Sequence, residues 1–229
     1  LKIAKESIFT GTNNFVSNTI TSSRLNEYYG FVQNEVDRIL EDAEIKGKGD
    51  IMKKWYDGYH FGDVDVYCPW DVMCYVDDLQ KNPNAKPDEY WKDTSDNAII
   101  RSFIDYAGAS ITKKLETLMN GGYIIQRVDE NLTYDYLHSS EENLWSLMYL
   151  TGYLTQVRDY KNDDDWQDNM VALKIPNLEI KQIFETEVSK WFEDSSKKWN
   201  RTELFSSVWS EDCDKITKEV SALLRRTIS

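Results

Sequence analysis

The sequence has few of the residues that build disulfide frameworks or membrane spans. Its three cysteines, Cys68, Cys74 and Cys213, have spacings that match neither a disulfide framework nor a CxxC metal site, which indicates reduced thiols. The longest apolar run, over 144–154, is about half of the roughly 20 residues that a membrane span needs. The first residues carry charges where a signal peptide would be apolar. These absences predict a cytoplasmic protein with no membrane partner.

Positive charge is also in deficit. The chain has 27 basic and 40 acidic residues, a formal net charge of −13. Such a surface repels phosphate backbones on average, so we expect nucleic acid to be a partner only through other parts of a larger protein. The 41% hydrophobic content, with eight Trp, fourteen Tyr and eight Phe, is enough to form a core in 229 residues.

The chain contains no GxxxxGK[ST] string, in which backbone amides and a lysine surround nucleotide phosphates. The nearest candidate, over 47–49, lacks the first glycine and the hydroxyl residue. Both ends look like cuts, because Leu1 is not a start residue and Ser229 follows a helical run without a stop signal. We therefore expect a fragment with no catalytic residues, no metal ligands and no cofactor of its own.

The hydrophobic periods predict a mainly α (α+β) chain that begins with a multi-helical, lid-like region. Apolar positions three and four apart predict one or two helices over 25–45, broken near Gly30. Alternation around Gly62 predicts a hairpin over 60–67, and Pro69 suits the first turn of the next helix. The other helices expected in this part cover 51–55, 70–79, 95–107 and 110–120.

The following segment has the element order of a winged helix. After the helix over 110–120, the pattern predicts a strand over 123–128, a helix over 141–151 and a short β-hairpin. The hairpin strands are expected over 152–157 and 170–175, followed by a helix over 180–192 and more helices within 202–226. A winged helix also raises the alternative of a DNA-binding module, which the negative charge disfavours.

A second alternative is a magnesium-dependent nuclease of the PD-(D/E)XK type. Such a site needs an Asp on one strand and Glu-x-Lys on its neighbour, which Glu179 and Lys181 match, with Asp165 and Asp168 upstream. However, the Pro-Asn pair at 176–177 ends the strand before Glu179. This places the triplet in the first turn of a helix, where Glu complements the helix dipole.

The most unusual local composition is that of WYDGYHFG at 55–62, which is followed by VYCPWDV at 66–72. Four aromatic residues and two glycines in eight positions predict a tight turn in which Gly58 adopts a conformation that other residues avoid. Such a cluster could stack on a ligand base, but we favour a structural role that fixes the turn against the next helix.

These segments resemble the predicted AAA-ATPase family of bacteria and archaea, P-loop proteins in which a PD-(D/E)XK nuclease-like domain often follows the ATPase. The resemblance also covers KESIFTGTNNF at 5–15, YYGFVQNEV at 28–36, YWKDTSDN at 90–97, GYLT at 152–155 and IPNLEI at 175–180. The chain departs from the family at Val32, Cys68 and Asp71, where Thr, Asn and Ser are usual.

The resemblance implies that the phosphate-binding loop lies before Leu1 and the nuclease-like domain after Ser229. Residues 1–24 would be the end of the ATPase core, which makes Lys2, Lys5, Asn13 and Asn14 the candidates near nucleotide. Residues 25–108 would be the lid-like region, 109–192 the winged-helix-like domain and 193–229 helices that lead to the effector. ATP and Mg²⁺ are expected as cofactors of the parent protein, and its ATPase core and nuclease-like domain as the partners of this chain.

Overall fold

The computed structural model describes residues 24–91, 109–129, 140–158, 160 and 170–197, with the side chains of 191–197 excepted, and a few residues between 210 and 221. The predicted helix over 95–107 and most of the segment before Arg24 therefore lie outside the described residues. Of the helices expected within 202–226, residues 213–215, 217–218 and 221 are described, and they are helical.

The first part of the described chain consists of short helices around a hairpin. In order they are η2 (Asn26–Tyr28), α2 (Gln33–Asp42), α3 (Gly49–Tyr56), β1 (Tyr59–Phe61), β2 (Val64–Val66) and α4 (Pro69–Lys81). Pro69 occupies the first turn of α4, as predicted. Val32 lies at the N-cap of α2 and provides no side-chain hydrogen bond there. Its backbone N–H instead donates to Glu35 at 3.0 Å.

The hairpin predicted around Gly62 is confirmed. β1 and β2 pair antiparallel with Phe61 opposite Val64, so the turn has two residues, and Gly62 adopts a φ of +54° there. Beyond β2, Tyr67 and Phe31 exchange backbone hydrogen bonds of 2.8 and 3.2 Å. This bridge connects the hairpin to the entrance of α2.

The second part has the helix and strand order expected from the sequence. It contains α6 (Ala109–Met119), β3 (Ile124–Arg127), α7 (Glu141–Leu150), β4 (Thr155–Gln156), β5 (Met170–Lys174) and α8 (Leu178–Lys197). The three strands form an antiparallel sheet in the order β3-β5-β4. The described chain is thus mainly helical with two small antiparallel sheets, as predicted.

One strand is shorter than its sequence suggests. The apolar run over 152–157 predicted a strand, but only Thr155–Gln156 is one. The run begins as the end of α7: Gly152 has a φ of +90°, and the N–H of Leu154 bonds back to the carbonyl oxygen of Met148 at 3.0 Å. A left-handed glycine with a return bond ends a helix, so the first three residues belong to that cap.

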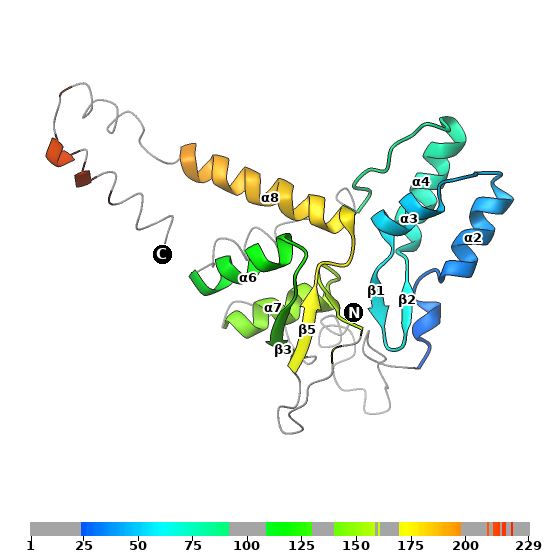
Figure 1. The fold of residues 1–229 in the computed structure, drawn as a ribbon, viewed down its shortest axis with the longest axis horizontal. Coiled ribbons are helices and arrows are strands. Elements are labelled where there is room, and N and C mark those ends of the chain that lie inside the picture. The colour runs from blue at the N-terminus through cyan, green and yellow to red at the C-terminus, as the bar shows by residue number, and fades with distance from the viewer. Residues whose placement is uncertain are drawn as a thin grey trace, which may run out of the picture.

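The buried side chains form two cores. One lies within α2, α3 and α4 and includes Met52, Tyr56 and Tyr75. The other joins α6, α7, the three-stranded sheet and α8, and the β1–β2 hairpin contributes Tyr59 and Val66 to it. Figure 1 shows α2–α4 on one side of this hairpin and α6, α7, β3 and β5 on the other.

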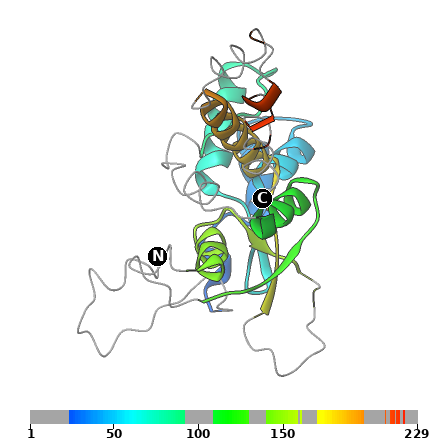
Figure 2. The same ribbon diagram turned by 90° about the vertical axis from the view of Figure 1, so that its left-hand side faces the viewer.

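Helix α8 links the two parts. Its contacts include α3 and α6; it starts beside α3 and extends away from it (Figure 1), and α6 lies below it in both views (Figures 1 and 2). Because α8 contacts both parts, its N-terminal end lies where the two cores meet. Within the described ranges, no helix combines the length and apolar character that crossing a bilayer requires.

Candidate functional site: a junction between the two cores

The junction begins where the turn after α3 meets the loop before α8. Gly58 has a φ of +104°, the conformation expected for it from the sequence. A Cβ atom at this position would overlap the carbonyl oxygen of Pro176 and lie 3.0 Å from its carbonyl carbon. Only glycine allows the two backbones to approach this closely. WYDGYHFG and IPNLEI are thus in direct contact.

Asn177, which follows Pro176 in the loop before α8, directs Glu179 into the junction. The side-chain oxygen of Asn177 accepts a hydrogen bond from the N–H of Ile180 at 3.0 Å, which is an N-cap contact. Helix α8 therefore starts at Leu178, and Glu179 lies in its first turn as predicted. The side chain of Glu179 is 0% exposed. The cap and the close approach at Gly58 together fix where this carboxyl group points.

Glu179 meets a second buried carboxyl group, that of Asp71 on α4. Asp71 is also 0% exposed, and its carboxyl group faces that of Glu179. One oxygen of Glu179 accepts the backbone N–H of Trp91 at 2.9 Å. Within the described chain, the other oxygen of Glu179 and both oxygens of Asp71 have no nitrogen or hydroxyl partner. A proton on one of the carboxyl groups would supply the donor that pairs them.

Burial decides the charge of this pair. Removal from water, followed by the proximity of Asp71, raises the pKa of Glu179 to about 9, although the N–H of Trp91 opposes the shift. Burial also raises the pKa of Asp71, while the Cys68 thiol and Glu179 lower it. Both shifts favour a pair that retains one proton at neutral pH. Glu179 occupies the first turn as expected, but it is buried against a second carboxyl group there and is not a solvated residue facing the helix dipole.

Aromatic side chains surround the junction. The rings of Trp91 and Tyr153 lie 4.9 Å apart, and the hydroxyl of Tyr56 accepts the N–H of Asp88 at 3.1 Å. A cavity of about 210 Å³ adjoins them. Its lining is mostly apolar and comes from β1, β2, the start of α4 and the end of α7, with the aromatic residues Tyr29, Tyr59, Phe61, Tyr67, Trp91 and Tyr149.

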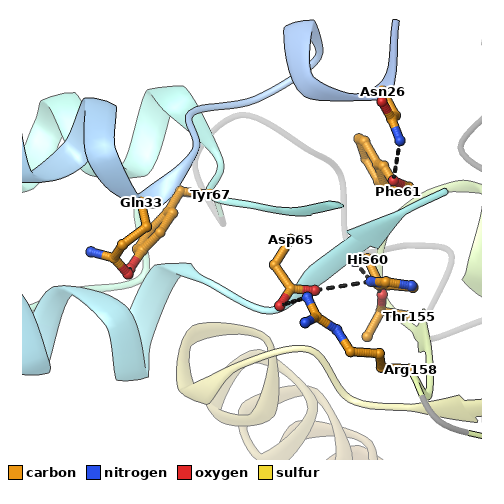
Figure 3. A network of polar contacts seen from close by, with 8 residues as sticks. All are labelled: Asn26, Gln33, His60, Phe61, Asp65, Tyr67, Thr155 and Arg158. Carbon is orange, nitrogen blue, oxygen red and sulfur yellow. Dashed lines mark hydrogen bonds and ion pairs between the residues drawn. The ribbon is translucent and has the colours of Figure 1, made fainter. Parts of the chain in front are cut away.

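A polar network lies along the hairpin (Figure 3). Asp65 on β2 accepts from His60 Nδ1 at 2.9 Å and pairs with the guanidinium of Arg158, which follows β4. Burial alone would raise the pKa of Asp65, but the bonds from Arg158 and His60 outweigh it and hold the pKa below its usual value. The N–H of His60 also donates to Thr155 at 2.9 Å. These bonds attach the hairpin to the sheet.

The residues proposed as nucleotide neighbours, Lys2, Lys5, Asn13 and Asn14, lie outside the described residues. So do Asp165 and Asp168 of the nuclease alternative. The other two residues of that alternative point to different neighbours. Glu179 is buried against Asp71, whereas Lys181 is partly exposed and its amine lies 3.9 Å from Glu185. Within the described ranges, no three His, Cys, Asp or Glu side chains gather as a metal site would require.

Sequence reasoning missed the role of Asp71. Val72, Tyr75 and Val76, which follow Asp71 on α4, are buried at helical spacing. From the sequence alone, an acidic residue next to them is expected to lie on the solvent-exposed face of the helix. The one available signal was that Asp71 stands where the resembling family usually has Ser. That departure introduces a carboxyl group opposite Glu179.

Comparison with known proteins finds a longer protein that is similar in sequence. An uncharacterized protein in the vnfD 5′ region of Azotobacter chroococcum mcd 1 is 26% identical over 183 residues, which cover 79% of this chain and 31% of that protein. The chain thus spans about a third of the length of its relative. No family model matches the chain, and no solved structure does so.

Proposed function

We propose that this chain is the lid and winged-helix-like region of a larger AAA-ATPase-like protein. In this proposal it has no independent turnover and couples the nucleotide state of an upstream ATPase core to a downstream nuclease-like effector. ATP and Mg²⁺ bind the upstream core, where Lys2, Lys5, Asn13 and Asn14 lie nearest to the nucleotide. The protein works in the cytoplasm, and any contact with nucleic acid is made through the effector.

One observation carries the proposal: segments that resemble the family, although far apart in sequence, meet at the junction between the two cores. Gly58 touches Pro176, and Glu179 accepts the N–H of Trp91. A Cβ atom on Gly152 would lie 3.6 Å from Tyr59 and 3.7 Å from Trp91. Tyr59 also pairs with Val66 of VYCPWDV, and the Phe31–Tyr67 bridge adds YYGFVQNEV, so six of the resembling segments are connected through direct contacts.

A junction of this kind suits a coupling element. Rigid bodies that rotate against each other in switch proteins need a defined joint, and small shifts there are amplified because packed cores have few alternative arrangements. Here the joint consists of a glycine contact, a capped helix start and a buried carboxyl pair. The length of the relative supports the proposal further, since about two thirds of that protein lie outside the matched region.

Calorimetry tests this function. The 229-residue chain and the complete product of its gene are each titrated with ATP in the presence of Mg²⁺. We expect micromolar affinity for the complete product and no binding in that range for the chain. Micromolar affinity of the chain alone would refute the assignment of the nucleotide site to an upstream core. Absence of binding by the complete product would refute the ATPase relationship.

A further inference from the structure

The buried carboxyl pair joins elements that belong to different cores. Asp71 lies on α4, and other residues of this helix, Val72, Tyr75 and Val76, belong to the core of α2–α4. Glu179 lies on α8 next to Ile180, which belongs to the core of the three-stranded sheet. The contact between Asp71 and Glu179 therefore connects the two bodies directly, through side chains that are both 0% exposed.

We propose that the single proton shared by Asp71 and Glu179 acts as a lock between the two cores, and that its loss releases α8 from α4. With the proton in place, one carboxyl group donates to the other and the pair carries one negative charge. Without it, two carboxylates face each other in a site that excludes water. Like charges at hydrogen-bond distance in a low-dielectric site repel strongly, so the side chains must separate or admit water.

The groups that face the pair provide no cation to replace the proton. The titratable neighbours are Tyr56 on α3, Tyr59 on β1, and Cys68 and Cys74 at α4. All four are neutral at pH 7, since burial raises the pKa of each of them. The remaining contacts are with backbone N–H groups, that of Trp91 among them. Among the described residues that face the pair, the proton is thus the only positive charge.

The pH dependence of this lock has a definite sign. The folded-state pKa of Glu179, about 9, lies above its ordinary value near 4.5. A group with a raised pKa contributes stability that is fully present below pH 4.5 and is lost as pH rises through 9. The lock therefore weakens toward alkaline pH and is open above pH 9. Because the contact lies within this chain, the proposal holds independently of nucleotide binding.

The test compares Glu179→Gln with the unaltered chain. The introduced amide would keep the acceptor for Trp91 and offer a permanent N–H donor to Asp71, so it imitates the protonated state. Denaturant midpoints are measured from pH 5 to pH 10, with Asp77→Asn as the control because Asp77 is an exposed carboxylate on the same helix as Asp71. We expect the unfolding free energy of the unaltered chain and of Asp77→Asn to fall more steeply with pH than that of Glu179→Gln. The difference in slope corresponds to up to about one bound proton per molecule. Equal pH dependence of all three proteins would overturn the proposal.

A second measurement does not depend on whether the variant folds. Infrared difference spectra of the unaltered chain between pH 7 and pH 10 report the carbonyl stretch of protonated carboxylic acids. The lock predicts one such band at pH 7 that disappears near pH 9, together with a loss of protection against backbone hydrogen exchange at the start of α8, relative to the intrinsic base-catalysed rate at each pH. A spectrum without a carboxylic acid band at pH 7, or disappearance of the band with unchanged exchange protection, would contradict the lock.

Discussion

Gly58 and Pro176 touch through their backbones, and no other residue type fits at position 58 without displacing one of them. Gly58→Ala should therefore reduce the free energy of unfolding for two reasons, the overlap with Pro176 and the φ of +104°. We expect a loss of at least about 2 kcal/mol, measured by denaturant unfolding. Gly121→Ala separates the two causes, because Gly121 also has a positive φ, +82°, but no atom lies within 4 Å of its added Cβ. Equal losses in the two variants would show that the contact with Pro176 adds nothing.

Two helix starts differ in their capping, which gives a paired prediction. Ser140 accepts the N–H of Asn143 at 3.2 Å at the start of α7, whereas Val32 offers no hydroxyl to α2. Ser140→Ala should cost about 1 kcal/mol of unfolding free energy, and Val32→Thr should raise it by up to about 1 kcal/mol. Thermal unfolding of both variants measures the changes. A loss on Val32→Thr would show that the apolar packing of Val32 outweighs a cap.

We expect the ion pair between Asp65 and Arg158 to make a small contribution to the free energy of unfolding, which is lost at acidic pH. The lowered pKa of Asp65 means that this stability is present above its ordinary pKa and is lost as pH falls through the folded-state value. Both side chains are about half-exposed, so Arg158→Ala should cost less than about 1 kcal/mol at pH 7. The difference should shrink at pH 3. Arg38→Ala is the control, because its pair with Asp42 is 3.8 Å long and fully at the surface; a larger effect there would contradict the assignment.

The nuclease alternative predicts a different outcome from ours. If Glu179 and Lys181 formed a magnesium site, the chain would cleave duplex DNA with Mg²⁺, and Lys181→Ala would abolish cleavage with the fold intact. We expect no cleavage that depends on either residue. Lys181→Ala is the cleaner variant, since Glu179→Ala also removes a partner of Asp71 and Trp91. Salt-sensitive binding of duplex DNA by the chain would support the winged-helix alternative instead.

Local patterns were enough to predict most of the described elements. The hairpin followed from alternation around Gly62, the start of α4 from Pro69, and the end of β5 before Glu179 from the Pro-Asn pair. Each of these signals acts over a few residues, through backbone conformation or a missing donor. The excess strand predicted over 152–157 shows the limit of this reasoning, because an apolar run does not reveal that Gly152 ends a helix.

The junction itself could not be read from the sequence. Its decisive contacts join positions that are remote along the chain, such as Asp71 with Glu179 and Gly58 with Pro176. The sequence did indicate that Gly58 needed an unusual conformation, but not which backbone approaches it. The pairing of the carboxyl groups depends on complete burial, which arises only when α4 and α8 pack together.

Hydrogen exchange at the junction tests the coupling role most directly. The complete gene product is measured with Mg²⁺ and either ATP or ADP, and exchange is followed in peptides covering 68–81 and 176–190. We expect several-fold different exchange in these peptides between the two nucleotides, and no difference in α2, which lies away from α8. Identical exchange at the junction, while calorimetry shows that both nucleotides are bound, would contradict the account.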